Sequence, residues 1–202
     1  MSDTFHTLKA PSEGIYKEKM SKFLSFAHPV CSAEEARNII KRYQKDYFDA
    51  RHVCWAYMIG ASRAEFMSND NGEPSGTAGR PILGQINSFG LTNIVIVVVR
   101  YFGGIKLGTS GLIVAYKEAA AEAIRNGEII ECHEQTAIEF SFPYLSMNEV
   151  MKATKRDDIQ ILGQTFDNCC TMKFSIRSDY AAAIIEKITQ IDGVSLLSTT
   201  KE

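Results

Sequence analysis

The sequence lacks any apolar run long enough to span a bilayer, and its opening stretch, MSDTFHTLKAPSEG, lacks the apolar core of a signal peptide. It also lacks a surplus of either charge, because 22 Lys and Arg residues stand against 24 Asp and Glu residues, for a formal net charge of −2. Such a chain has no overall positive field that would attract nucleic acid, although a local basic patch is compatible with its composition. We therefore expect no signal peptide and no membrane partner.

Cysteine is present, but not at the spacings of a metal site or a redox motif. No C-x-x-C pair occurs among the five cysteines, and His28 with Cys31, or Cys132 with His133, would supply only half of a zinc site. An odd number of cysteines favours free thiols, which are typical of a reducing compartment. The sequence therefore predicts a cytoplasmic protein with no metal site and no cofactor.

The first part of the chain alternates between strand-like and helix-like patterns. We expect the first residues, rich in Ser, Gly, Pro and Lys, to form a short mobile tail, followed by two strands that turn near Lys19 and Met20. Ser32 and Glu35 have the spacing of a capping box, which predicts a helix at 33–50. The further elements expected here are a strand at 51–60, a loop at 68–81, a short helix at 82–89, a buried central strand at 93–102 and a helix from Thr109 or Ser110 to near Gly127.

The pattern changes after about Thr136. Segments there read strand, helix, strand, strand, helix, strand, with a turn expected at Asp167 and Asn168, and this βαββαβ order is typical of a ferredoxin-like module. Since 202 residues suffice for two small domains, we expect one domain at 1–130 and a second at 131–202, with proteolysis cutting between them.

The glycine-rich turn after the central strand fails two familiar tests. Gly103 and Gly108 have the spacing of a phosphate-binding P-loop, but Thr109 stands where that loop needs lysine. Ser110 has a glycine two residues before it but Leu112 two residues after it, so it does not form a nucleophile elbow. Two interpretations stay open: an anion-binding helix start, or glycines that only allow tight packing beside a capped helix.

A second polar loop, SNDNGEPSGTAGRP, is longer and richer in glycine than a simple connection needs. Asp70 and Glu73 within it could bind a divalent ion, but two carboxylates make an incomplete site. We expect them instead to pair with Arg80 and Arg100 and so hold the two loops together.

Three aromatic residues near these loops have two possible roles each. Tyr101 and Phe102 could stack on nucleic-acid bases, or one could pack in the core while the other lies on the sheet surface. His52, on the preceding strand, is more often structural than catalytic in such a position.

Two long blocks together resemble the signature of the YigZ/IMPACT family, namely DNGEPSGTAGRP (Asp70–Pro81) and VVVRYFGGIKLGTSGL (Val97–Leu112). The segments DARHVCWAY (Asp49–Tyr57) and SKF (Ser21–Phe23) match its flanking blocks. The resemblance runs from about Gly14 to Ile130, and the ferredoxin-like tail is that of the bacterial, YigZ-type branch. Eukaryotic members join the first domain to a different module.

The resemblance implies an α+β protein of two domains. The first would be an α/β sandwich resembling the second domain of a small-subunit ribosomal protein, in a superfamily that includes a translocase domain, a ribonuclease P protein and small-molecule kinases. The second would be a ferredoxin-like sandwich resembling the fifth domain of elongation factor G. IMPACT proteins regulate translation by binding the activator of an initiation-factor kinase, and nucleic-acid binding is the usual suggestion for bacterial members.

Two functions follow from these observations. The first is a binding or regulatory module, linked to translation, that engages RNA or a translation component through the cleft between the two loops. The alternative is an enzyme that acts on a small phosphorylated or otherwise anionic substrate at the same helix start, since KLGTSGL resembles the loop of the kinase relatives. Binding is favoured because no matching second half and no evident catalytic base accompany that loop.

The candidate residues form two groups. The expected ligand-binding residues are Arg100, Tyr101, Phe102, Gly103, Gly104, Lys106, Gly108, Thr109, Ser110 and Gly111. The expected loop cluster consists of His52, Asp70, Gly72, Glu73, Gly76, Thr77 and Arg80.

Overall fold

The structure, a computed structural model, describes residues 3–167 and 169–201. The described residues form two compact units, one running from Phe5 to Cys132 and the other from His133 onward together with the residues up to Thr4. The division falls two residues after the boundary expected at 130/131. Independent folding of the two parts stays a prediction.

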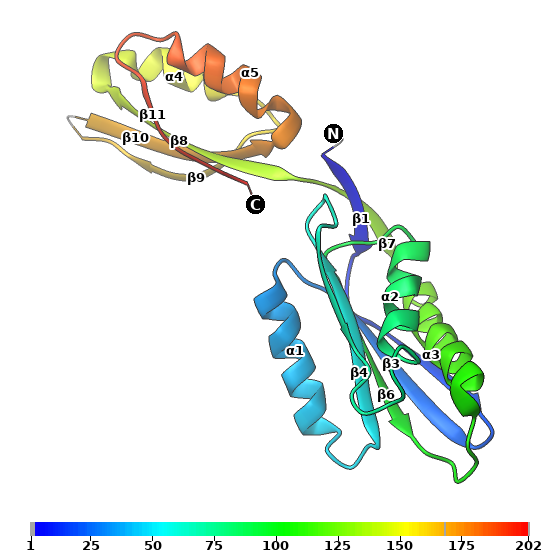
Figure 1. Ribbon diagram of the computed structural model, residues 1–202. Helices are drawn as coiled ribbons and strands as arrows, with labels where there is room; N and C mark the ends of the chain where they lie inside the picture. Colours follow the sequence, from blue (N-terminus) through cyan, green and yellow to red (C-terminus); the bar gives the residue numbers. More distant parts are fainter. Residues whose placement is uncertain (1–2, 168, 202) are drawn as a thin grey trace. The chain divides into compact units, whose positions relative to one another are not determined.

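The first unit is built on a five-stranded antiparallel sheet with the strand order β2-β3-β6-β4-β5. Helix α1 covers one face of this sheet, and α2 and α3 cover the other (Figure 1). The strands are β2 (Ser12–Glu18), β3 (Ser21–Pro29), β4 (His52–Ile59), β5 (Glu65–Asn69) and β6 (Ile94–Tyr101), and the helices are α1 (Ala33–Asp46), α2 (Gly79–Ser88) and α3 (Gly108–Arg125).

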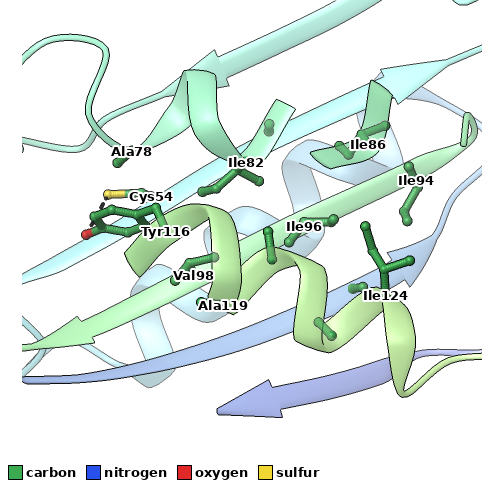
Figure 2. Packing of buried hydrophobic residues seen from close by; sticks show 14 of the residues in the cluster. Cys54, Ala78, Ile82, Ile86, Ile94, Ile96, Val98, Tyr116, Ala119 and Ile124 are labelled. Atoms are coloured by element: carbon green, nitrogen blue, oxygen red, sulfur yellow. Dashed lines mark hydrogen bonds between the residues drawn. The ribbon is translucent and has the colours of Figure 1, made fainter. Parts of the chain in front are cut away.

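Strand β6 is the central strand that its uninterrupted apolar run predicts. Ile94, Ile96 and Val98 pack against α2 and α3, as Figure 2 shows, whereas Val95 and the other odd-numbered valines face the α1 side. All of these side chains are fully buried, so the strand has no solvent-facing side. Arg100 continues the even-numbered row, and its side chain is therefore carried to the α2–α3 face at the end of the strand.

Local sequence signals explain several element boundaries. Lys19 and Met20 both have positive φ and turn β2 into β3, as expected. The hydroxyl of Ser32 accepts the backbone N–H of Glu35 and begins α1, while the Glu35 carboxylate accepts the N–H of Cys31 rather than that of the cap residue. Strand β5 was not expected, because its sequence EFMSN is exposed along most of its length and shows no alternation.

The described residues near the start of the chain, from Asp3 onward, do not form the expected mobile tail. Residues Thr4–Leu8 form β1, which pairs with β7 (Ile129–His133), a strand that the sequence pattern also did not indicate. Asp3 is buried and its carboxylate accepts two hydrogen bonds from the Arg177 guanidinium, at 2.8 and 3.1 Å. These hydrogen bonds lower the pKa of Asp3 from 3.8 to about 2.

The second unit contains a four-stranded sheet with the order β11-β8-β10-β9, and α4 and α5 pack against one of its faces (Figure 1). All six elements expected after Thr136 are present: β8 (Gln135–Pro143), α4 (Met147–Thr154), β9 (Gln160–Thr165), β10 (Cys169–Arg177), α5 (Ser178–Thr189) and β11 (Ser195–Lys201). The turn expected at Asp167 and Asn168 falls partly outside the described residues. Within the described ranges, none of the helices has the length and apolar character needed to cross a membrane.

Candidate functional site

A cavity of about 460 Å³ lies in the first unit, where the loop after β5 meets the end of β6 and the start of α3. The two glycine-rich segments were expected to come together, and both contribute to the walls of this cavity. The lining residues are Arg51, His52, Glu73, Pro74, Arg100, Phe102, Lys106, Leu107, Gly108, Thr109 and Leu112.

A buried ion pair between Glu73 and Arg100 forms part of the cavity wall. Arg100 Nη1 donates to Glu73 Oε1 at 2.5 Å, and the two side chains are only 7% and 3% exposed. The guanidinium also lies between two aromatic rings, with Cζ 5.5 Å from the Phe23 centroid and 5.6 Å from that of Phe102. Since a buried carboxylate or guanidinium alone would be strongly destabilising, each of these residues depends on the other.

Helix α3 supplies a second donor to the same carboxylate. The Tyr116 hydroxyl donates to Glu73 Oε1 at 2.9 Å. The Cys54 sulfur lies 3.3 Å from the Tyr116 oxygen, a contact visible in Figure 2, and 2.9 Å from the carbonyl oxygen of Asp70, to which its single S–H can donate. Burial raises the pKa of both Tyr116 and Cys54, so both groups stay protonated near neutral pH. The network therefore holds the Glu73 side chain as a shared acceptor between strand β6 and helix α3.

His52 lies beside this ion pair with a defined tautomer. Its Nδ1 is 2.8 Å from the carbonyl oxygen of Asn71, and since a carbonyl can only accept, Nδ1 must carry a proton. Its Nε2 lies 3.8 Å from Glu73 Oε1, which is longer than a hydrogen bond. His52 is also one of the residues that line the cavity.

Asp70 organises its own loop instead of joining the pair across the cavity. Its carboxylate accepts the backbone N–H groups of Gly76, Ala78 and Gly79 at 2.8 to 3.0 Å. Partial burial alone would raise the pKa of Asp70, but these hydrogen bonds and the charge of Arg80 outweigh it and lower the pKa. The carboxylate thus occupies the N-terminus of α2, where negative charge is favourable.

The N-terminus of α3 is built differently. The helix begins at Gly108, whose φ is +73°, and its N-cap residue is Leu107, whose side chain has no atom that can accept a hydrogen bond. The helix thus starts at Gly108 and not at Thr109 or Ser110 as expected, and these two residues lie inside its first turn. Lys106, Gly108 and Thr109 all line the cavity, so the start of α3, whose first N–H groups have no side-chain cap, lies at its edge.

The structure separates the expected ligand-binding residues into groups. Arg100, Phe102, Lys106, Gly108 and Thr109 line the cavity. The others lie elsewhere. Tyr101 faces the α1 side, and its hydroxyl donates a hydrogen bond to Asp49. A neighbouring groove is lined by Tyr16, Ser110 and Gly111, while Gly103 packs on the backbone of Met20 and Gly104 is exposed.

The expected loop cluster is divided in the same way. Only His52 and Glu73 line the cavity, and the pairing expected between the loops is present as the Glu73–Arg100 ion pair. Arg80 is exposed, and Gly72, Gly76 and Thr77 shape the loop backbone, the last through a hydrogen bond to Pro74. Among the described residues, no three His, Cys, Asp or Glu side chains gather as they would around a metal ion.

Sequence reasoning did not name the lining residues Pro74, Leu107 and Leu112 as part of the site, and it missed three polar residues there. Tyr116 was expected only as part of the apolar face of α3, and Cys54 only as a strand residue, because a hydroxyl or thiol that bonds across a core leaves no mark in the hydrophobic pattern. Arg51 gave no signal beyond its charge, next to His52.

Comparisons with known proteins match the part of the chain that carries this cavity. Residues 19–124 match the model of the "Impact N-terminal domain" family. The chain is 37% identical to IMPACT family member YvyE of Bacillus subtilis, over 65% of this chain but only 60% of that relative. It is 30% identical to an IMPACT family member of Haemophilus influenzae, over 85% of this chain and 84% of the relative. A crystal structure of a hypothetical protein superposes with a TM-score of 0.76 and 27% identity, covering 98% of each chain.

Proposed function

The chain belongs to the IMPACT family, and from this premise we propose that it is a binding protein linked to translation that holds a phosphate group of RNA in the cavity of the first unit. The phosphate would lie at the start of α3, where Lys106 and the first residues of the helix line the cavity. The pocket between the two glycine-rich segments is then the site at which the protein contacts its partner.

One observation carries this proposal, namely the contrast between two helix starts in the same unit. The N-terminus of α2 is filled by the carboxylate of Asp70, which accepts the N–H groups of Ala78 and Gly79. The N-terminus of α3 opens on a cavity that also contains Arg100 and Lys106, and its cap residue offers no acceptor. An anion from outside the protein would satisfy these donors as Asp70 satisfies those of α2.

The remaining parts of the proposal concern fold family and location. We propose that the first unit resembles the second domain of a small-subunit ribosomal protein. We also propose that the second unit is a ferredoxin-like sandwich resembling the fifth domain of elongation factor G, and its strand order β11-β8-β10-β9 supports this assignment. A reducing, cytoplasmic location is supported by the five cysteines, all of which are free thiols.

Crosslinking in cells tests the proposed function. The full chain is crosslinked to bound RNA with ultraviolet light and recovered, in parallel with the variants Lys106→Glu and Lys41→Glu. Lys41 is an exposed residue of α1, on the opposite face of the sheet, and controls for the change in net charge. We expect Lys106→Glu to lose most of the RNA and Lys41→Glu to retain it. Equal recovery from all three proteins, or no RNA from any, would contradict the proposal.

A second candidate function is catalysis on a small phosphorylated substrate, and the geometry of His52 favours it. Because Nδ1 donates to Asn71, a neutral His52 presents the lone pair of Nε2 to the cavity and could accept a proton from a bound hydroxyl group or water. The variant His52→Gln separates the two functions. A binding protein should keep most of its RNA affinity, whereas an enzyme should bind its substrate but lose turnover.

A further inference from the structure

We infer that the cavity selects a terminal phosphate, that is a phosphomonoester dianion, over the internal phosphodiesters of an RNA chain. This inference rests on the proposed function and specifies the ligand of the same site. It follows from the charge of the cavity, from the free donors of Arg100 and from the apolar character of the remaining wall.

The charges that line the cavity match a dianion. Arg51, Arg100 and Lys106 contribute three positive charges and Glu73 contributes one negative charge, which leaves two positive charges before His52 is considered. The partial positive charge at the start of α3 adds to this field. A phosphomonoester carries about −1.5 to −2 at neutral pH, whereas an internal phosphodiester carries a single negative charge and would leave the site incompletely neutralised.

Arg100 provides the second observation that points to a ligand. Although the side chain is 93% buried, its Nε has no hydrogen-bond partner among the described residues. Its guanidinium has five N–H donors, and in the described chain it uses Nη1 to bind Glu73. Nearly all buried polar atoms in folded proteins have partners, so a cavity-lining guanidinium with unused donors indicates a site made for an acceptor with several oxygens.

The rest of the wall is apolar and fits the organic part of the ligand. Pro74, Phe102, Leu107 and Leu112 line the cavity beside the charged groups. Its volume of about 460 Å³ is that of a small-molecule site and much larger than a phosphate group alone needs. Phe102 is 47% exposed, so part of its ring surface can be contacted by a base. A nucleotide with a terminal phosphate therefore satisfies the charges, the volume and the aromatic wall together.

The experiment compares short single-stranded RNAs of one sequence that differ only at their ends: 5′-phosphate, 3′-phosphate, or hydroxyl groups at both ends. Their affinity for the full chain is measured by fluorescence anisotropy at one salt concentration, with AMP and inorganic phosphate as competitors. We expect at least one phosphorylated RNA to bind about ten- to a hundredfold more tightly than the unphosphorylated one, since several charge-assisted hydrogen bonds are gained.

Two variants and one control assign that preference to the cavity. Lys106→Glu reverses one charge of the site, and Thr109→Pro removes one backbone N–H from the first turn of α3, where proline is tolerated. Both should abolish the preference for a phosphorylated end, whereas Lys41→Glu should preserve it. Displacement of the RNA by AMP would identify a free nucleotide as a source of the phosphate, and resistance to AMP would identify an RNA end.

The failure of this inference differs from the failure of the proposed function. If all RNAs bind equally and Lys106→Glu weakens each of them to the same extent, the cavity holds internal phosphates and the inference is overturned while RNA binding stands. If the protein binds AMP but none of the RNAs, the phosphomonoester site stands and RNA binding is overturned. If neither RNA nor AMP binds, both are overturned.

Discussion

Replacing Glu73 by glutamine should destabilise the first unit more than any change to an exposed carboxylate. The substitution preserves the size of the side chain but leaves Arg100 buried at 7% exposure without its counter-charge. It also weakens the hydrogen bond from Tyr116, since an amide oxygen is a poorer acceptor than a carboxylate. Strand β6 and helix α3 would then be joined at this point by weaker contacts.

The expected loss follows from the two contacts. Breaking a buried ion pair by removing one partner costs about 3–5 kcal/mol, and the retained amide oxygen places this case near the lower limit of about 3 kcal/mol. For a unit of this size, a loss of roughly 3 kcal/mol lowers the melting temperature by about 10 °C. The double variant Glu73→Gln/Arg100→Met removes the unpaired charge and should recover a substantial part of this loss.

Tryptophan fluorescence measures this effect in one unit alone, because Trp55 in β4 is the only tryptophan of the chain and belongs to the first unit. Urea unfolding followed at Trp55 is compared for wild type, both variants and the control Glu65→Gln. Glu65 is an exposed residue of β5, and its substitution should change stability by less than about 0.5 kcal/mol. A Glu73→Gln protein as stable as the control, or a double variant no more stable than Glu73→Gln, would refute the reasoning.

Three further predictions concern packing, acid stability and thiol chemistry. In α2, Gly84→Ala should raise the melting temperature in thermal unfolding, because an added Cβ meets nothing within 4 Å. Gly79→Ala should lower the melting temperature, because its Cβ would lie 2.7 Å from a backbone nitrogen of the preceding strand. Because the pKa of Asp3 is depressed in the folded protein, the ionised carboxylate adds to stability. This contribution is fully present above pH 3.8, the ordinary pKa, and is lost as the pH falls through about 2. The melting temperature of wild type should therefore decrease over this pH interval more steeply than that of Asp3→Asn. In native protein a thiol reagent should modify exposed Cys31 quickly and buried Cys54, whose pKa is raised by burial, only after unfolding, as peptide mass spectrometry would show.

The sequence predicts most of the fold because its strongest elements have strong periodicity. The apolar run of β6 and the spacing of Leu112, Tyr116, Ala120 and Ile124 on α3 depend only on burial, which the hydrophobic pattern records directly. The weak elements are β1, β5 and β7, which lie at sheet edges or form a separate two-stranded sheet. Their residues are partly exposed, so no alternation marks them.

The candidate site was predictable in composition but not in its pairing. Opposite charges in two glycine-rich segments indicated a contact between the segments, and Glu73 and Arg100 make it. Which acid would pair with Arg100 could not be read from the sequence, because it depends on how the loop folds on itself around Asp70. Tyr101 and Phe102 are neighbours in the chain, but only Phe102 lines the cavity. This difference depends on the alternation of side chains along β6 and on the end of that strand at Tyr101.

The contact between Asp3 and Arg177 has a consequence for biosynthesis. The two residues are 174 positions apart, and the N–H of Asp179 also points to the same carboxylate. During synthesis on the ribosome, Asp3 is therefore made long before its partners exist, and its carboxylate must stay hydrated until Arg177 and Asp179 have been added. A bulky fusion partner attached close to Asp3 would then disturb the unit that contains His133 and the residues after it, although the fusion partner is far from that unit in the sequence.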